Sequence, residues 1–105
     1  MKNKQATMDN MLQQSSQAAA FLKALSNENR LMILCYLVEQ ELSVTALNDK
    51  LPLSQSALSQ HLAILRKDGL VSTRRESQTI YYSLGDVRVK ELIHTLHGLF
   101  CARES

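Results

Sequence analysis

The chain has 105 residues, of which 45% are hydrophobic and 21% charged, and its formal net charge is +2 at pH 7. A chain of this length forms a single domain, and its apolar runs are too short to cross a membrane. The amino terminus lacks the apolar stretch of a secretory signal, so we expect a cytoplasmic protein with reduced cysteines unless they have a redox role. No glycine-rich phosphate loop or nucleophile constellation beyond the cysteines is present, which argues against an enzyme.

Polar residues 1–9 are expected to form a mobile tail, followed by a single domain over residues 10–105. A narrow stripe of apolar and small residues at helical spacing then predicts a first helix. Asn27 is a plausible cap for a second helix that runs to about Gln40. The stripe of the first helix consists of Met11, Ser15, Ala18, Ala19, Leu22 and Leu25.

Ser43 predicts the cap of a short helix over residues 44–51, and a turn at Pro52 separates it from a longer amphipathic segment. In that segment Leu58, Leu62 and Leu65 recur at helical spacing and anchor the helix to a core. Short hydrogen-bonding side chains occupy its other face, and such side chains suit base edges in the DNA major groove. An ordinary surface helix with a polar outside is the alternative. The candidate DNA-contacting residues of this helix are Gln55, Ser56, Ser59, Gln60, His61 and Lys67.

A β-hairpin is predicted directly after this helix, which ends at Gly69. Residues 70–74 and 79–84 read as its two strands, joined by a polar turn. Side chains near the tip of such a hairpin reach phosphates or the minor groove, although solvated arginines on an edge strand are the alternative. Helix, turn, helix and hairpin together predict a winged helix-turn-helix. The candidate DNA-contacting residues of the hairpin are Arg74, Arg75 and Gln78.

Asp86 predicts the cap of a last helix, which carries a second apolar stripe. The first and last helices have more apolar surface than a small winged helix needs, so we assign them to a homodimer interface. The alternative is that both complete the core of one subunit. The predicted fold is mainly α with a small β-hairpin, in the order α-α-α-α-β-β-α. The last stripe consists of Val89, Leu92, Ile93, Leu96 and Phe100.

Charge is unevenly distributed along the chain. Residues 27–50 hold four acidic and two basic side chains, a net charge of −2, whereas residues 51–83 hold two acidic and four basic side chains, a net charge of +2. The basic block coincides with the proposed DNA face. Phosphate contacts from such a block supply sequence-independent affinity that weakens with salt.

Three segments, residues 24–34, 53–71 and 81–84, together resemble the signature of the ArsR/SmtB family of bacterial winged-helix repressors. The resemblance implies four helices, a β-wing and a final helix, with dimerisation through the first and last helices. It also implies that the homodimer binds double-stranded DNA at an imperfect palindromic operator.

Many members of that family sense metals, but this chain departs from their sites. Ser43 and Thr45 stand where one site has a cysteine pair, and Arg88 replaces the histidine of another. Neutral hydroxyls are poor ligands for soft ions. We therefore expect no metal and no other cofactor, and a metal-responsive repressor stays an alternative.

Cys35 and Cys101 resemble the thiol pair of the dithiol, HlyU/BigR/SqrR-like branch, whose members sense reactive sulfur or oxidants. The resemblance implies that the helices carrying them pack together and bring the sulfurs within disulfide or polysulfide reach, so that oxidation lowers DNA affinity. Two alternatives stay open: the cysteines are merely buried, or they join His94 and His97 in a zinc site. A transcriptional activator using the same fold is also possible.

Overall fold

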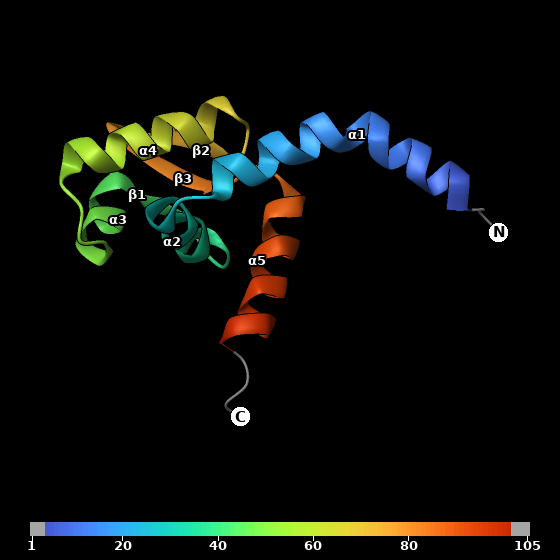
Figure 1. Cartoon of the computed structure of the whole chain (residues 1–105). Coiled ribbons are helices and arrows are strands. Elements are labelled where there is room, and N and C mark those ends of the chain that lie inside the picture. The colour runs from blue at the N-terminus through green and yellow to red at the C-terminus, as the bar shows by residue number, and fades with distance from the viewer. Residues whose placement is uncertain (1–3, 102–105) are drawn as a thin grey trace.

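The computed structural model describes residues 4–101, with side chains from residue 8 onward (Figure 1). Within that range five helices and a three-stranded antiparallel sheet form a winged helix-turn-helix, which confirms the predicted fold class. In chain order the elements are α1 (Lys4–Leu25), α2 (Glu28–Leu37), β1 (Leu42–Ser43), α3 (Val44–Lys50), α4 (Gln55–Lys67), β2 (Val71–Glu76), β3 (Thr79–Leu84) and α5 (Val87–Phe100).

Polar caps begin four of the helices. Asn27, Ser43 and Asp86 each accept a hydrogen bond from a backbone N–H of the following helix, at 2.9 to 3.1 Å, which confirms the three predicted caps. Ser54 caps α4 in the same way, accepting from the N–H of Ala57 at 3.1 Å. Such a cap contributes about 1 kcal/mol to helix stability.

The hairpin β2–β3 pairs Arg74 with Tyr81, and its turn contains Ser77, whose φ of 57° lies in the left-handed region that tight hairpin turns require. Strand β2 reaches Glu76, two residues beyond the predicted end. Strand β1 was not predicted, because two residues are too short to show an alternating pattern. It pairs with β3 on the side opposite β2 and therefore joins the segment before α3 to the wing.

The core lies where α2, α3 and α4 meet the sheet. The predicted anchors of α4, Leu58, Leu62 and Leu65, are completely or almost completely buried. Helix α2 ends at Leu37, three residues before the predicted end. The core fixes α4 rigidly, so that its other face is presented to the surroundings.

Helices α1 and α5 extend away from this body (Figure 1). Only the last turn of α1 is buried, through Ala24 and Leu25, while Met11 and Leu22 of the predicted stripe are each 56% exposed. The radius of gyration is 16.1 Å, against about 13 Å for a compact chain of similar length. The alternative in which α1 completes the core of one subunit is therefore wrong for most of that helix.

Helix α1 begins at Lys4, so it includes residues 4–9 of the segment predicted as a tail, and residues 1–3 lie outside the described part of the chain. No helix between residues 4 and 101 is both long enough and apolar enough to cross a bilayer.

Candidate DNA interface and thiol pocket

Helix α4 presents its polar face outward because its leucine face is buried in the core. Five of the six candidate DNA contacts on this helix are exposed: Gln55, Ser56, Ser59, Gln60 and Lys67. Their side chains include hydroxyl and amide groups, which can both donate and accept hydrogen bonds. A helix whose apolar face is fixed in the core and whose polar face is exposed is suited to enter a major groove.

His61 differs from the other candidates on α4. Its side chain is half-buried, and its Nδ1 atom is buried without a hydrogen-bond partner among the described residues. The ring therefore lies at the boundary between the core-facing and outer sides of the helix. His61 is a weaker candidate for base contact than Gln60 beside it.

A hollow of about 470 Å³ separates α4 from strand β3. It is lined by Ser59 and Lys67 from the predicted set and by Arg66 and Tyr82, which the predicted set omitted. The signal for Arg66 was the basic pair in the last turn of α4. Two cations beside this hollow can bind backbone phosphates next to the groove helix.

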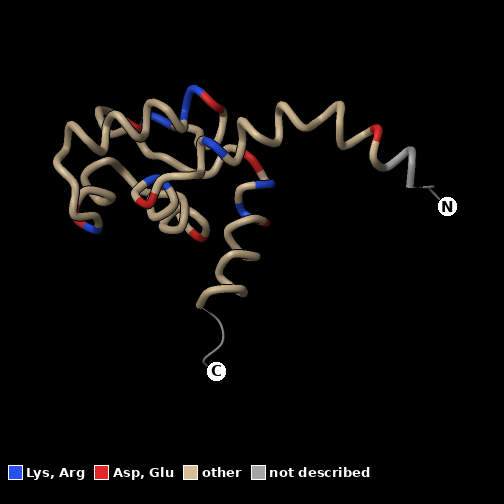
Figure 2. Tube along the Cα trace, in the orientation of Figure 1, with Lys and Arg blue, Asp and Glu red and all other residues tan. Residues whose placement is uncertain are grey.

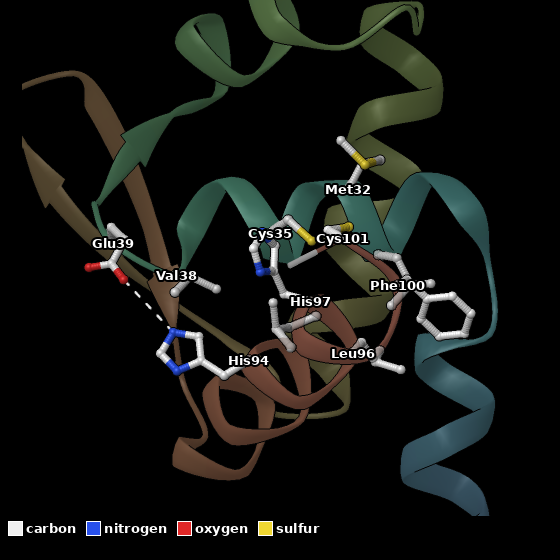
Figure 3. Close-up of a pocket in the computed structure, with 11 residues that line it drawn as sticks. Met32, Cys35, Val38, Glu39, His94, Leu96, His97, Phe100 and Cys101 are labelled. Carbon is white, nitrogen blue, oxygen red and sulfur yellow. Dashed lines mark ion pairs between the residues drawn. The ribbon is translucent and has the colours of Figure 1, made fainter. Parts of the chain in front are cut away.

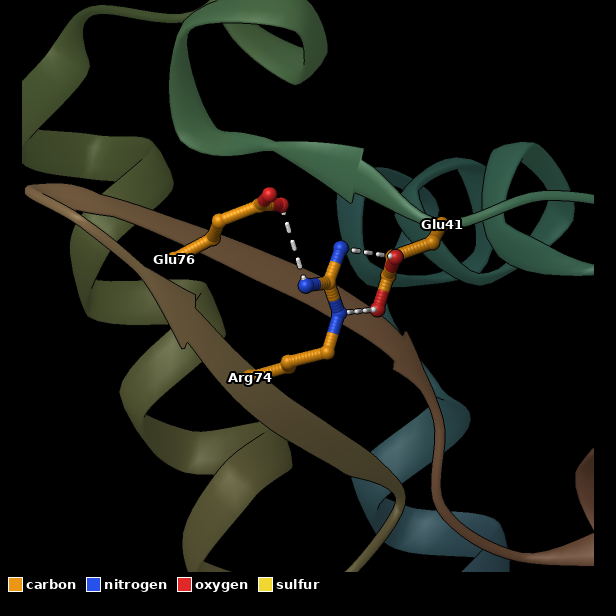
Figure 4. Close-up of polar contacts among 3 residues, drawn as sticks. All are labelled: Glu41, Arg74 and Glu76. Atoms are coloured by element: carbon orange, nitrogen blue, oxygen red, sulfur yellow. Dashed lines mark hydrogen bonds and ion pairs between the residues drawn. The ribbon is translucent and has the colours of Figure 1, made fainter.

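The wing arginines lie in different environments. Arg74 donates to both carboxylate oxygens of Glu41, from Nε at 3.0 Å and from Nη2 at 2.8 Å, and to Glu76 at 3.1 Å (Figure 4). Its guanidinium also lies 4.8 Å from the ring centre of Tyr81. These hydrogen bonds lower the pKa of Glu41, so that its carboxylate stays ionised.

Arg75, by contrast, is exposed and forms no ion pair within residues 8–101, and Gln78 is exposed at the turn. Glu41, from the acidic segment before α3, therefore neutralises the charge of Arg74 in the basic segment. This ion pair partly cancels the separation of charge along the sequence. Arg75 is the wing cation that is free to meet phosphate.

Cys35 on α2 and Cys101 at the end of α5 line one cavity of about 560 Å³, although they are 66 residues apart in sequence (Figure 3). Their side chains lie side by side in Figure 3, close enough for the charge of Cys101 to act on the Cys35 thiol. The walls are mainly apolar and come from the same two helices and from the residues directly after α2. These apolar residues are Leu31, Met32, Val38, Ile93, Leu96 and Phe100.

Both cysteines are exposed and neither is in a disulfide, so the alternative of simple burial is wrong. Partial desolvation by the cavity walls, and secondly the charge of Cys101, raises the pKa of the Cys35 thiol above its ordinary value. Cys35 is therefore mainly a neutral thiol at pH 7. Accessible paired thiols of this kind can react with sulfur electrophiles.

Two histidines also line the cavity. His94 Nε2 lies 3.9 Å from a carboxylate oxygen of Glu39, a long contact between exposed groups, and His97 lies one turn before Cys101. Within the described residues, no three His, Cys, Asp or Glu side chains are placed to hold a metal ion. The geometry thus gives no support to the zinc alternative.

Residues 27–73 match the family model described as bacterial regulatory protein, arsR family. The chain is 52% identical over 101 residues to the transcriptional activator HlyU of Vibrio cholerae serotype O1, a match covering 96% of this chain and 94% of that protein. A solved structure described as reduced HlyU from Vibrio cholerae N16961 has a TM-score of 0.83 at 55% identity, and covers 88% of this chain and 97% of that one.

Two further relatives are informative. A biofilm growth-associated repressor of Xylella fastidiosa is 40% identical, over 93% of this chain and 86% of that protein. A homodimeric winged helix-turn-helix DNA-binding domain from Mycobacterium bovis has a TM-score of 0.73 at 28% identity, with 94% of this chain and 86% of that one covered.

Proposed function

Because the chain belongs to the ArsR/SmtB family of DNA-binding transcriptional regulators, we propose that it is a repressor released from its operator when Cys35 and Cys101 are oxidised or bridged by reactive sulfur. The observation that carries this proposal is that two thiols distant in sequence lie side by side in the lining of one accessible cavity. A regulator of bacterial promoters acts in the cytoplasm, where such thiols start out reduced.

In this proposal α4 enters the major groove of an imperfect palindrome. The exposed hydroxyl and amide side chains of α4 read bases, while Lys67 and Arg75 contact phosphates. Ser59 and Gln60 lie near the middle of the exposed face, between the two ends of the helix. They are therefore the side chains on which direct readout depends most.

In this proposal the DNA-binding form of the protein is a homodimer joined through α1 and α5. Residues 10–22 of α1 and the second half of α5 contain no Lys, Arg, Asp or Glu (Figure 2). Both helices expose large apolar side chains, including Met11, Leu12, Leu22, Leu99 and Phe100. A second copy would cover this surface, and one relative is described as homodimeric.

Coupling between the thiols and DNA follows from the contacts of α2. This helix contacts both α5 and α4. A covalent bridge between Cys35 and Cys101 fixes the end of α5 against α2. Since α5 also joins the two subunits, the bridge changes the spacing between the two α4 helices and lowers operator affinity.

The test is fluorescence anisotropy on a labelled DNA fragment from upstream of the gene, with random DNA of equal length as a control. The reduced protein should bind, and a persulfide donor or diamide should weaken binding at least tenfold. Cys35→Ser and Cys101→Ser should bind like the reduced protein and stay insensitive. A single variant that still responds fully would exclude the paired-thiol mechanism, and mass spectrometry would distinguish a direct disulfide from a bridge with extra sulfur.

A second candidate function is activation, because the relative with 52% identity is named a transcriptional activator. The same DNA face and thiol pair would serve an activator equally well. Deletion of the gene with a reporter on its target promoter separates the two. Rising output indicates a repressor, and falling output an activator.

A further inference from the structure

We propose that the thiol cavity selects neutral organic disulfides and persulfides by binding their apolar substituent beside the two sulfurs. This inference rests on the proposed redox function and names the class of molecule that reaches the thiols. A volume of about 560 Å³ is in the range of small-molecule sites. Leu31, Val38, Ile93 and Leu96 line the same cavity as the thiols and supply apolar wall.

Charge in the cavity disfavours anionic reagents. Neither lysine nor arginine is among the residues that line it, whereas the carboxylate of Glu39 does line it. The contact of this carboxylate with His94 is long, 3.9 Å, and both side chains are more than half exposed, so it compensates little of that negative charge. A substituent carrying carboxylates or a sulfonate would lose hydration here without gaining a partner.

The chemistry needs no oxidant besides the bound compound R–S–S–X, in which X is hydrogen or a second R group. One thiolate attacks the sulfur bearing R, which forms a mixed disulfide and releases XS⁻. The other thiolate then attacks the cysteine sulfur of that mixed disulfide, which forms the Cys35–Cys101 disulfide and releases RS⁻. The two cysteines are oxidised, the S–S bond of the compound is reduced, and the two thiol protons go to the released sulfides.

The dependence of the reaction rate on the length of the apolar substituent tests this inference quantitatively. Each methylene transferred from water to an apolar wall favours binding by up to about fourfold. The reaction rate should therefore rise along a series of alkyl groups until the cavity is filled. Exposed thiols without a binding site would show no such dependence.

Methanethiosulfonates supply matched probes with one reactive group and different substituents. We would compare methyl, butyl and hexyl reagents with sulfonatoethyl and trimethylammonioethyl reagents on the full-length reduced protein. Mass spectrometry follows the modification, and each rate is divided by the rate on the same protein unfolded in urea. The expected result is a rise of at least tenfold from methyl to hexyl, with the sulfonatoethyl reagent slower than both the butyl and the trimethylammonioethyl reagents.

Substitution at the rim provides the control. Met32→Lys adds a cation to the cavity and should raise the ratio of the sulfonatoethyl rate to the hexyl rate at least fivefold. Val87→Lys adds the same charge at an exposed position at the beginning of α5, outside the cavity, and should leave that ratio unchanged. A flat alkyl series, or equal ratios in the two variants, would overturn the inference. If diamide still releases DNA in that case, the proposed function stands and only the selectivity is wrong.

Discussion

Glu41 and Arg74, 33 residues apart in sequence, are joined by two parallel hydrogen bonds of 2.8 and 3.0 Å between carboxylate and guanidinium. The pair connects the segment before β1 to the wing. A carboxylate in this two-pronged geometry occupies the same donors that a phosphate would use. DNA must therefore displace Glu41 before Arg74 can contact the backbone.

Glu41→Gln should release Arg74 and raise DNA affinity about threefold or more at low salt, with a steeper salt dependence by up to about one phosphate contact per subunit. Anisotropy titrations at several salt concentrations measure both quantities. Glu39→Gln removes an equal charge that does not contact Arg74 and is the matched control. Equal gains in the two variants would show a general charge effect and contradict the competition.

Arg75→Ala should weaken binding to operator and random DNA alike, and by more than Arg74→Ala does. The reason is that Arg75 has no ion pair within the described residues, whereas Arg74 is already held by Glu41 and Glu76. The salt slope should fall by about one for Arg75→Ala. A larger loss for Arg74→Ala would reverse this assignment.

Ser59→Ala and Gln60→Ala should reduce the preference for operator over random DNA by about 1 to 3 kcal/mol, because both side chains lie on the exposed face of α4. Competition titrations with the two DNAs give the preference directly. Ala63 lies on the same exposed face and has no side-chain hydrogen-bonding group. The operator preference of Ala63→Ser is therefore compared with that of the two alanine variants, as a conservative change on the same face that removes no hydrogen-bonding group. If the alanine variants lose equal affinity for both DNAs, these residues do not read sequence.

Alkylation of Cys35 should depend on pH with a midpoint above that of an ordinary cysteine thiol, because desolvation and the charge of Cys101 both raise the pKa of its thiol. A raised pKa keeps the reactive thiolate scarce at neutral pH, so the rate with iodoacetamide should climb as the pH rises through that midpoint. Peptide mass spectrometry measures the rate at Cys35 alone. Cys101→Ser should lower the midpoint only in part, since desolvation is the larger cause.

Leu22→Lys should weaken the homodimer at least tenfold, because Leu22 is 56% exposed on the apolar side of α1 in a single subunit. Sedimentation equilibrium measures the association, and operator binding should fall with it. Gln13→Lys places the same charge on the opposite side of α1. An unchanged dimer in Leu22→Lys, or equal weakening by Gln13→Lys, would argue against this interface.

Local features of the fold were predictable because they depend on neighbouring residues. The caps at Asn27, Ser43 and Asp86 and the buried leucines of α4 follow from spacing and hydrogen-bonding chemistry. Strand β1 and the pairing of Glu41 with Arg74 depend on segments brought together by the tertiary fold. Periodicity within a short window carries no information about such contacts.

The DNA-binding face and the thiol cavity could be predicted from the sequence to different degrees. The exposed face of α4 follows from helical periodicity, except that His61 lies partly inward. The meeting of Cys35 and Cys101 was implied by the family resemblance rather than by any local pattern. The exposure of the two cysteines could not be predicted, because the helical periodicity of apolar residues is the same whether that face of the helix packs in a core or lines an open cavity.

Helix α5 is anchored near its beginning, where Val89 and Ile93 are buried, whereas Phe100 at its far end is 78% exposed. A rod held at one end acts as a lever. A displacement of about 2 Å at the tip of a rod about 21 Å long tilts its axis by roughly 5°. Cys101 lies at that end of the helix. In the proposed homodimer, an S–S bond formed there would therefore tilt one subunit relative to the other.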